Sequence, residues 1–206
     1  WLPACGALAT TNHDAEAGAI GETLERYCAG IARFSALSAD AVPVNVRRLG
    51  HEDFALYSTE QLANPDFPWP EEAYCKALYA EVFSLSANEP VWVPQELVGM
   101  GTREGSPTIP STSSGLAAHT DGWLALLRAT QEILERDALT VTWLNSLGGR
   151  QFDLSETYQN QVAERGGEVL AFDLTQQWNS HPVVAVCGNL PLRGRPRFAL
   201  GAACRE

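Results

Sequence analysis

A five-residue acidic pattern occurs twice in this chain, and each copy lies in a segment whose periodicity predicts a helix. Residues 22–26 read Glu-Thr-Leu-Glu-Arg, residues 132–136 read Glu-Ile-Leu-Glu-Arg, and the two copies start 110 residues apart (132 − 22). Carboxylates three residues apart project from one helical face, about one turn from each other. If the two helices face each other, the fold gathers four carboxylates around one cavity, where their repulsion requires bound cations.

The pattern has a second interpretation, because a glutamate and an arginine four residues apart form a helix-surface ion pair worth about 0.2–0.5 kcal/mol. Each copy taken alone favours this exposed pair. The recurrence of both glutamates, the leucine and the arginine in the same register favours a shared role, with Glu22, Glu25, Glu132 and Glu135 as metal ligands. Hard carboxylate oxygens suit Mg²⁺, which keeps waters and shares its shell with phosphates. Neither histidine nor cysteine clusters with these residues, which argues against zinc.

Composition excludes several classes of protein. With 206 residues, 45% of them hydrophobic, the chain can bury one substantial core or at most two small ones. A net charge of −11 argues against a nucleic-acid partner, and no run of 18 apolar residues is present to span a membrane. Lys76 is the one lysine of the chain, which nearly excludes a Walker-type nucleotide site and most Schiff-base chemistry.

The cysteines and the chain ends carry information about context. Five scattered cysteines without a CxxC pair are typical of a cytoplasmic protein with reduced thiols, and not of a zinc ribbon or a disulfide framework. The chain opens at Trp1 without the charged region of a signal peptide. Because it also lacks an initiator methionine and stops directly after a strand-like run, we expect it to be an excerpt of a longer protein.

The hydrophobic periodicities predict an α+β fold. The two acidic helices are expected over 14–31 and from Thr120 or Asp121 to about Asn145. A hairpin is expected over 80–93, and a third helix over 155–164. Three further strands are expected at 169–173, 182–187 and 198–203.

The segment 99–115, before the second acidic helix, is dense in glycine, serine, threonine and proline and predicts a loop. At its end, Ser113 and Ser114 precede a glycine and a helix N-terminus, an arrangement that can cradle a phosphate or ribose through backbone N–H groups and hydroxyls. Most loops of this kind are merely capped turns. Arg128 lies four residues before Glu132, so it can reach a phosphate or act as a salt-bridge partner.

Taken together, these motifs resemble the YcaO family. The matching segments are 15–27, 89–98, 111–119, 132–138 with Trp143, and 173–184. The most specific parts are Ser-Thr-Ser-Ser-Gly-Leu-Ala-Ala-His at 111–119 and Glu-Ile-Leu-Glu-Arg-Asp-Ala at 132–138. The match covers nearly the whole chain in the expected order. We therefore expect residues 1–206 to be a single, partial YcaO-like domain, without the family's glycine-rich opening and a later helix that bears arginine and glutamate.

The resemblance implies an α+β fold with two glutamate-rich helices packed on mixed or antiparallel sheets. It implies ATP binding without a P-loop, with the four glutamates of the acidic patterns holding Mg²⁺ ions that bridge the phosphates. Arg136 is the implied catalytic residue, orienting a phosphate or a carboxylate. The candidate nucleotide contacts are Ser113, Ser114, Arg128 and Arg136. The family often has serine where Gly18 stands and asparagine where Ser114 stands, so these two contacts differ here.

The implied reaction is ATP-dependent activation of a peptide-backbone amide. In cyclodehydratases of the family, a Cys, Ser or Thr side chain of a ribosomally made precursor peptide attacks the preceding carbonyl. The oxyanion takes the γ-phosphoryl group, and phosphate leaves to give an azoline, as in bacteriocin biosynthesis. His119 and the cysteines have no catalytic role in this scheme. The implied partners are the precursor peptide, a protein that binds its leader segment, and a second copy in a homodimer.

Three alternatives stay open at this stage. The same activation with sulfide as the nucleophile would give a thioamide. A degenerate nucleotide-binding scaffold would dock a partner and catalyse nothing. A non-enzymatic acidic helical module is disfavoured, because such a module does not require the acidic pattern to recur in the same register.

Overall fold

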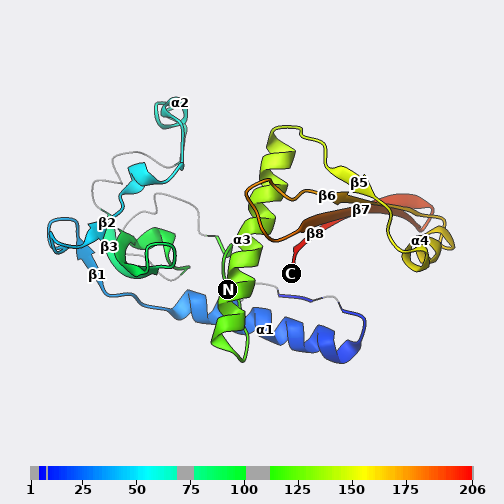
Figure 1. The fold of residues 1–206 in the computed structure, drawn as a ribbon, viewed down its shortest axis with the longest axis horizontal. Coiled ribbons are helices and arrows are strands. Elements are labelled where there is room, and N and C mark those ends of the chain that lie inside the picture. The colour runs from blue at the N-terminus through cyan, green and yellow to red at the C-terminus, as the bar shows by residue number, and fades with distance from the viewer. Residues whose placement is uncertain (1–4, 8, 69–76, 101–111, 206) are drawn as a thin grey trace. The chain divides into compact units, whose positions relative to one another are not determined.

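The computed structural model describes residues 5–7, 9–68, 77–100 and 112–205, whose helices and strands are drawn in Figure 1. The chain divides into two compact units, Trp1–Ser113 and Ser114–Glu206. Each unit contains one sheet and one of the two acidic helices. The two units are therefore described in turn.

The first unit is built on a four-stranded sheet in the order β1-β3-β4-β2. Its centre is the antiparallel hairpin of β3 (Leu78–Ser84) and β4 (Glu89–Pro94), which confirms the hairpin expected from the sequence. Strand β1 (Ala36–Ser38) pairs antiparallel with β3, and β2 (Arg47–Arg48) pairs parallel with β4, so the sheet is mixed. The short helical elements are η1 (His51–Asp53), α2 (Thr59–Leu62) and η3 (Gln95–Leu97).

The first acidic helix, α1 (Asn12–Ile31), begins where the Thr11 hydroxyl accepts a backbone N–H of the first turn at 3.1 Å. The usual amphipathic helix buries its apolar face, but the large apolar side chains of this helix are more than half exposed. They are Ile20 (61%), Leu24 (54%), Tyr27 (56%) and Ile31 (53%). The side chains of Glu22, Glu25 and Arg26 are only 18–30% exposed. The acidic pattern is thus the more protected part of α1.

The second unit is an antiparallel sheet in the order β5-β6-β7-β8. Its strands are β5 (Arg150–Phe152), β6 (Glu168–Asp173), β7 (Val183–Leu192) and β8 (Arg195–Cys204). Strands β7 and β8 form a long hairpin that turns at Arg193 and Gly194, both with positive φ. The sequence predicts shorter strands here, at 182–187 and 198–203, since glycine and proline weaken a strand pattern.

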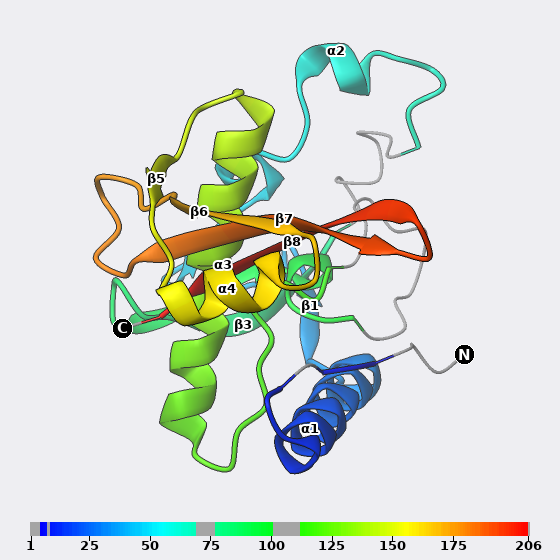
Figure 2. The ribbon, with the colours of Figure 1, turned by 90° about the vertical axis from the view of Figure 1, so that its right-hand side faces the viewer.

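The second acidic helix, α3 (Gly122–Leu144), packs against β7 and β8 and crosses the strand direction steeply (Figures 1 and 2). Its cap is Asp121, one of the two expected residues, whose carboxylate accepts two backbone N–H groups at 2.8 and 3.1 Å. The contact is apolar, because Ala138 of α3 joins a buried cluster with strand residues. These are Val183 and Ala185 of β7 and Cys204 of β8, and Leu174, the residue directly after β6, belongs to the same cluster. This packing fixes the acidic pattern of α3 relative to the sheet.

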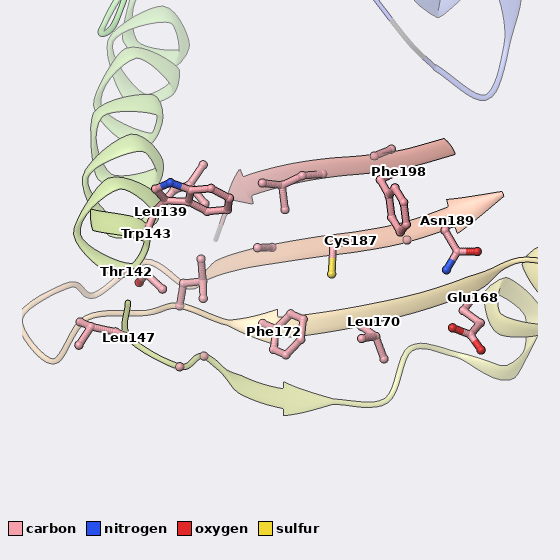
Figure 3. Close-up of a pocket in the computed structure, with 17 residues that line it drawn as sticks. Leu139, Thr142, Trp143, Leu147, Glu168, Leu170, Phe172, Cys187, Asn189 and Phe198 are labelled. Carbon is pink, nitrogen blue, oxygen red and sulfur yellow. The ribbon is translucent and has the colours of Figure 1, made fainter. Parts of the chain in front are cut away.

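An open apolar pocket of about 640 Å³ lies beside the C-terminal half of α3 (Figure 3). Leu139 and Trp143 of α3 line it together with Phe172 of β6 and Phe198 of β8. Glu168 is the one carboxylate among its described lining residues. Neither acidic pair, Glu22 with Glu25 or Glu132 with Glu135, is among the described residues that line this pocket.

The α+β class is confirmed, with one mixed and one antiparallel sheet. The third helix is also confirmed as α4 (Glu156–Ala163), which is followed by Gly166 at φ +73°. Residues 101–111 of the expected loop lie outside the described residues. Among the described helices, none is long and apolar enough to cross a membrane.

Candidate functional site

The acidic pair of the first unit is held by local contacts on both of its sides. One carboxylate oxygen of Glu22 accepts a hydrogen bond from the Gly6 N–H at 2.9 Å, and the other accepts one from Arg26 Nη2 at 3.2 Å. Arg26 Nε also lies 3.7 Å from Glu25. One arginine therefore partly neutralises both carboxylates, and a backbone N–H fixes the orientation of the first.

The acidic pair of the second unit repeats this arrangement. One carboxylate oxygen of Glu132 accepts the Gly115 N–H at 2.9 Å, and the other accepts Nε and Nη2 of Arg136 at 2.9 and 2.8 Å. In both units the first glutamate of the pattern thus lies between a glycine N–H upstream of the helix and the arginine one turn later. The recurrence found in the sequence therefore extends to the hydrogen bonds.

Glu135 contacts the sheet instead of an arginine. One of its carboxylate oxygens accepts a hydrogen bond from the Cys204 N–H at 3.2 Å. Burial raises the pKa of the Glu135 carboxyl, and repulsion by Glu132 adds a smaller increase. The acidic patterns predict repulsion among the carboxylates, and the raised pKa of Glu135 agrees in direction, but burial is its main cause.

This raised pKa gives a stability prediction for the protein without bound metal. The folded protein binds the Glu135 proton more tightly than the unfolded chain, so the ionised carboxylate costs stability above the ordinary glutamate pKa of about 4.3. Glu135→Gln removes the charge and keeps an acceptor for the Cys204 N–H. We expect a higher midpoint of thermal unfolding at about pH 7 and a difference that shrinks toward zero below about pH 4. Melting curves across this range check it, and a lower midpoint at about pH 7 contradicts it.

The position of Gly115 depends on its backbone conformation as well as on its hydrogen bond to Glu132. Its φ is +82°, and a Cβ at this position would lie 2.9 Å from Cδ1 of Ile133. Glycine alone adopts this backbone readily. The loop end formed by Ser113, Ser114 and Gly115 therefore brings a backbone N–H to Glu132. His119 accepts the Asp121 N–H at 2.9 Å through Nδ1, which gives it a structural hydrogen bond at the start of α3.

Gly115→Ala should lower the free energy of unfolding by about 1–2 kcal/mol, because a Cβ is strained at positive φ. Gly122→Ala is the matched control, since Gly122 lies at the start of α3 with no atom within 4 Å of its Cβ position. We expect the control to be neutral or up to about 1 kcal/mol more stable. Urea unfolding measures both, and equal effects of the two variants would rule out the strain at Gly115.

Arg128 does not form a salt bridge with Glu132, which was one of the two roles that the sequence left open for it. Its Nη1 donates to the side-chain oxygen of Gln131 at 2.6 Å. Gln131 was missed by the sequence analysis, because a glutamine next to a glutamate in a helix reads as surface, whereas it is only 1% exposed. A signal was present, since Gln131 lies seven residues before the buried Ala138 and so shares its helical face.

The acidic pairs have a donor set that fits Mg²⁺. Each pair presents carboxylate oxygens, and an oxygen that accepts one hydrogen bond has a further lone pair for a cation. Within either unit, the described residues contain no group of three or more His, Cys, Asp and Glu side chains able to hold a metal ion. Each unit thus supplies two carboxylates, a number with which Mg²⁺ is bound when phosphates and waters complete its shell. That all four carboxylates line one cleft stays a prediction.

The chain belongs to the YcaO family. The family model described as YcaO cyclodehydratase, ATP- and Mg²⁺-binding, matches residues 8–205 and so extends over both units. This confirms the family expected from the sequence motifs, and the description of the family includes the two expected cofactors, ATP and Mg²⁺. A search of curated proteins found no matching sequence.

Solved structures with the same fold include three that cover almost the whole chain. A heterocyclase in complex with substrate and cofactor has a TM-score of 0.81 at 20% identity, over 97% of this chain and 30% of that one. YcaO from Methanopyrus kandleri bound with AMPPCP and Mg²⁺ has a TM-score of 0.66 at 20% identity, over 96% and 49%. The Escherichia coli microcin synthetase McbBCD complex with pro-MccB17 bound has a TM-score of 0.69 at 15% identity, over 97% and 52%. The chain therefore spans between about a third and a half of the chains it matches.

Proposed function

We propose that the protein to which this chain belongs uses Mg·ATP to phosphorylate a backbone amide of a precursor peptide and so forms azoline rings from Cys, Ser or Thr. The observation that carries the proposal is the recurrence of one hydrogen-bonded Glu–Arg arrangement in both units of a YcaO-family chain. Residues 1–206 are on this view one partial YcaO-like domain, and its cytoplasmic location is part of the proposal.

The proposed metal ligands are the two acidic pairs, Glu22 with Glu25 and Glu132 with Glu135. Bound Mg²⁺ would supply charge neutralisation for the phosphates. The chain's own contribution is orientation, because the glycine N–H groups and the i+4 arginines hold two of the carboxylates in place before any ligand arrives. Preorganised carboxylates of this kind need little rearrangement on binding.

Arg136 is the proposed catalytic residue. Two of its N–H groups bind Glu132, and the fork geometry of a guanidinium leaves further N–H groups for a phosphate oxygen. Ser113 and Ser114 stand at the loop end next to Gly115 and are the proposed nucleotide contacts there, together with Arg128. No enzyme nucleophile is required, since the attacking group belongs to the peptide.

The experiment uses the full-length protein, a leader-binding partner protein and a precursor peptide with Cys, Ser or Thr residues. We expect ATP consumption and loss of one water per ring, measured by mass spectrometry. An oxygen-to-sulfur exchange that requires added sulfide would replace the proposal with thioamide formation. ATP binding without any mass change in the peptide would replace it with a nucleotide-binding scaffold. Size-exclusion chromatography of the same sample tests for a homodimer.

A further inference from the structure

Arg128 differs from Arg136 and Arg150 of the second unit in the kind of group that holds it. Arg136 and Arg150 are each paired with a carboxylate, at 2.8 and 2.7 Å. Among the described residues of the second unit, no carboxylate lies within ion-pair distance of Arg128, and its Nη1 is held instead by the neutral amide oxygen of Gln131 at 2.6 Å. Arg128 is therefore fixed by a short hydrogen bond and keeps its full charge.

The amide that holds Arg128 is buried and is itself held from its other side. The Gln131 side chain is among the largest that are fully buried, and its Nε2 lies 3.5 Å from Nδ1 of His181. Burying an amide without partners costs about 1–3 kcal/mol. With its oxygen on Arg128 and its nitrogen on His181, Gln131 has a partner at each end, which also fixes which way the amide points.

His181 is in turn set by its own backbone, where the chain enters β7. Its N–H donates to the side-chain oxygen of Asn179 at 2.9 Å, and it precedes Pro182, which restricts its backbone conformation. The Gln131 amide N–H can donate to Nδ1 of His181 when that ring nitrogen carries no proton. A chain of hydrogen-bonded contacts thus connects the residues before β7 with the guanidinium of Arg128, which has no carboxylate partner among the described residues of the second unit. Its members are Asn179, His181, Gln131 and Arg128.

We infer that Gln131 and His181 are positioning residues that hold Arg128 as a fixed, uncompensated cation for the phosphate chain of the nucleotide. The inference rests on the proposed function, in which Arg128 contacts the nucleotide. A carboxylate in place of the amide would hold Arg128 equally well but would cancel its charge. A buried amide holds the guanidinium through one N–H and leaves the other four for phosphate oxygens.

The test is a double-mutant cycle in the full-length protein, with Mg·ATP as the probe. Arg128→Met should raise the KM for ATP about 10- to 100-fold, the loss expected for charge-assisted hydrogen bonds. Gln131→Met conserves volume, removes both hydrogen bonds and should raise this KM about 10-fold with kcat little changed. The double variant should be no weaker than Arg128→Met alone, because Gln131 acts through Arg128. Gln159→Met, in the exposed part of α4, is the control and should change nothing.

Several results would overturn the inference. If the effects of Arg128→Met and Gln131→Met on the KM for ATP simply add, Gln131 does not act through Arg128 and has only a structural role. The same conclusion follows if Gln131→Met leaves the KM for ATP unaltered. If Gln131→Met fails to fold, His181→Leu takes its place, with the same expected increase in KM and the same non-additivity with Arg128→Met. If Glu132→Gln loses ATP binding and Arg128→Met keeps it, the role of Arg128 inferred here is wrong, while the proposed function still stands. A wild-type protein that binds no Mg·ATP would overturn the proposed function and this inference with it.

Discussion

Glu132→Gln in the full-length protein should lower the rate of ATP-dependent water loss from the precursor peptide by at least ~100-fold, the effect of removing a preorganised charge from a transition state. Glutamine still offers an oxygen to the Gly115 N–H, so the local fold is expected to survive. What disappears is the negative charge that pairs with Arg136 and that is proposed to bind a cation. Initial rates of mass loss and of phosphate release, measured on the same samples, give the size of the effect. Glu135→Ala should abolish water loss as well, because it removes the second carboxylate of the pair.

Two kinds of control accompany this result. Glu156→Gln removes a carboxylate from the exposed first turn of α4 and should leave the rate within about 2-fold. Cys28→Ala, on the exposed surface of α1, and Cys187→Ala, in the apolar pocket, should also retain activity, because the proposed reaction uses no enzyme thiol. Complete loss of activity in a folded cysteine variant would show that the nucleophile has been assigned wrongly. Full activity in Glu132→Gln would show that the proposed metal ligands have been assigned wrongly.

The parts of the fold that the sequence predicts well are those set by neighbouring residues. Helix α3 begins at Asp121, whose carboxylate caps two N–H groups, and α4 is followed by Gly166 at positive φ. Caps and glycine stops act within one helical turn, so they can be read from a few adjacent letters. The hairpin of β3 and β4 is similarly local, because its strands follow each other closely.

The features that the sequence does not reveal depend on contacts between distant residues. The burial of Gln131 arises because α3 packs on the second sheet and brings His181, 50 residues later, against the amide. The hydrogen bond from Gly115 to Glu132 likewise needs the loop to adopt its positive φ. On α1, the periodic apolar residues predict a core-facing side, and yet Ile20 and Leu24 are more than half exposed. A periodic pattern of apolar residues shows which face of a helix can be buried. Whether that face is buried depends on contacts with residues far away in the sequence, which the pattern does not contain.

Mg·ATP should also protect the full-length protein against thermal unfolding. A ligand that binds only the native state at 100 times its dissociation constant adds about 2.7 kcal/mol of stability. For about 150–250 cooperatively unfolding residues this corresponds to a rise of about 5–10 °C in the midpoint, and the rise is smaller when a longer chain unfolds as one unit. Glu22→Gln, in the first unit, and Glu132→Gln, in the second, should each remove most of this rise. The measurement is a pair of melting curves for each variant, with and without Mg·ATP.

The variants in the two units together test whether both acidic pairs serve one ligand. Glu16→Gln is the matched control on α1, because Glu16 lies on the same helix as Glu22 but is exposed and outside the acidic pattern. It should keep the full rise with Mg·ATP. If Glu132→Gln loses the protection while Glu22→Gln keeps it, the nucleotide is held by the second unit alone and the shared four-carboxylate site is wrong. Loss in both variants, with the control unchanged, is the result expected when a single cation-bound nucleotide needs carboxylates from each unit, since removing one ligand charge then weakens the whole site.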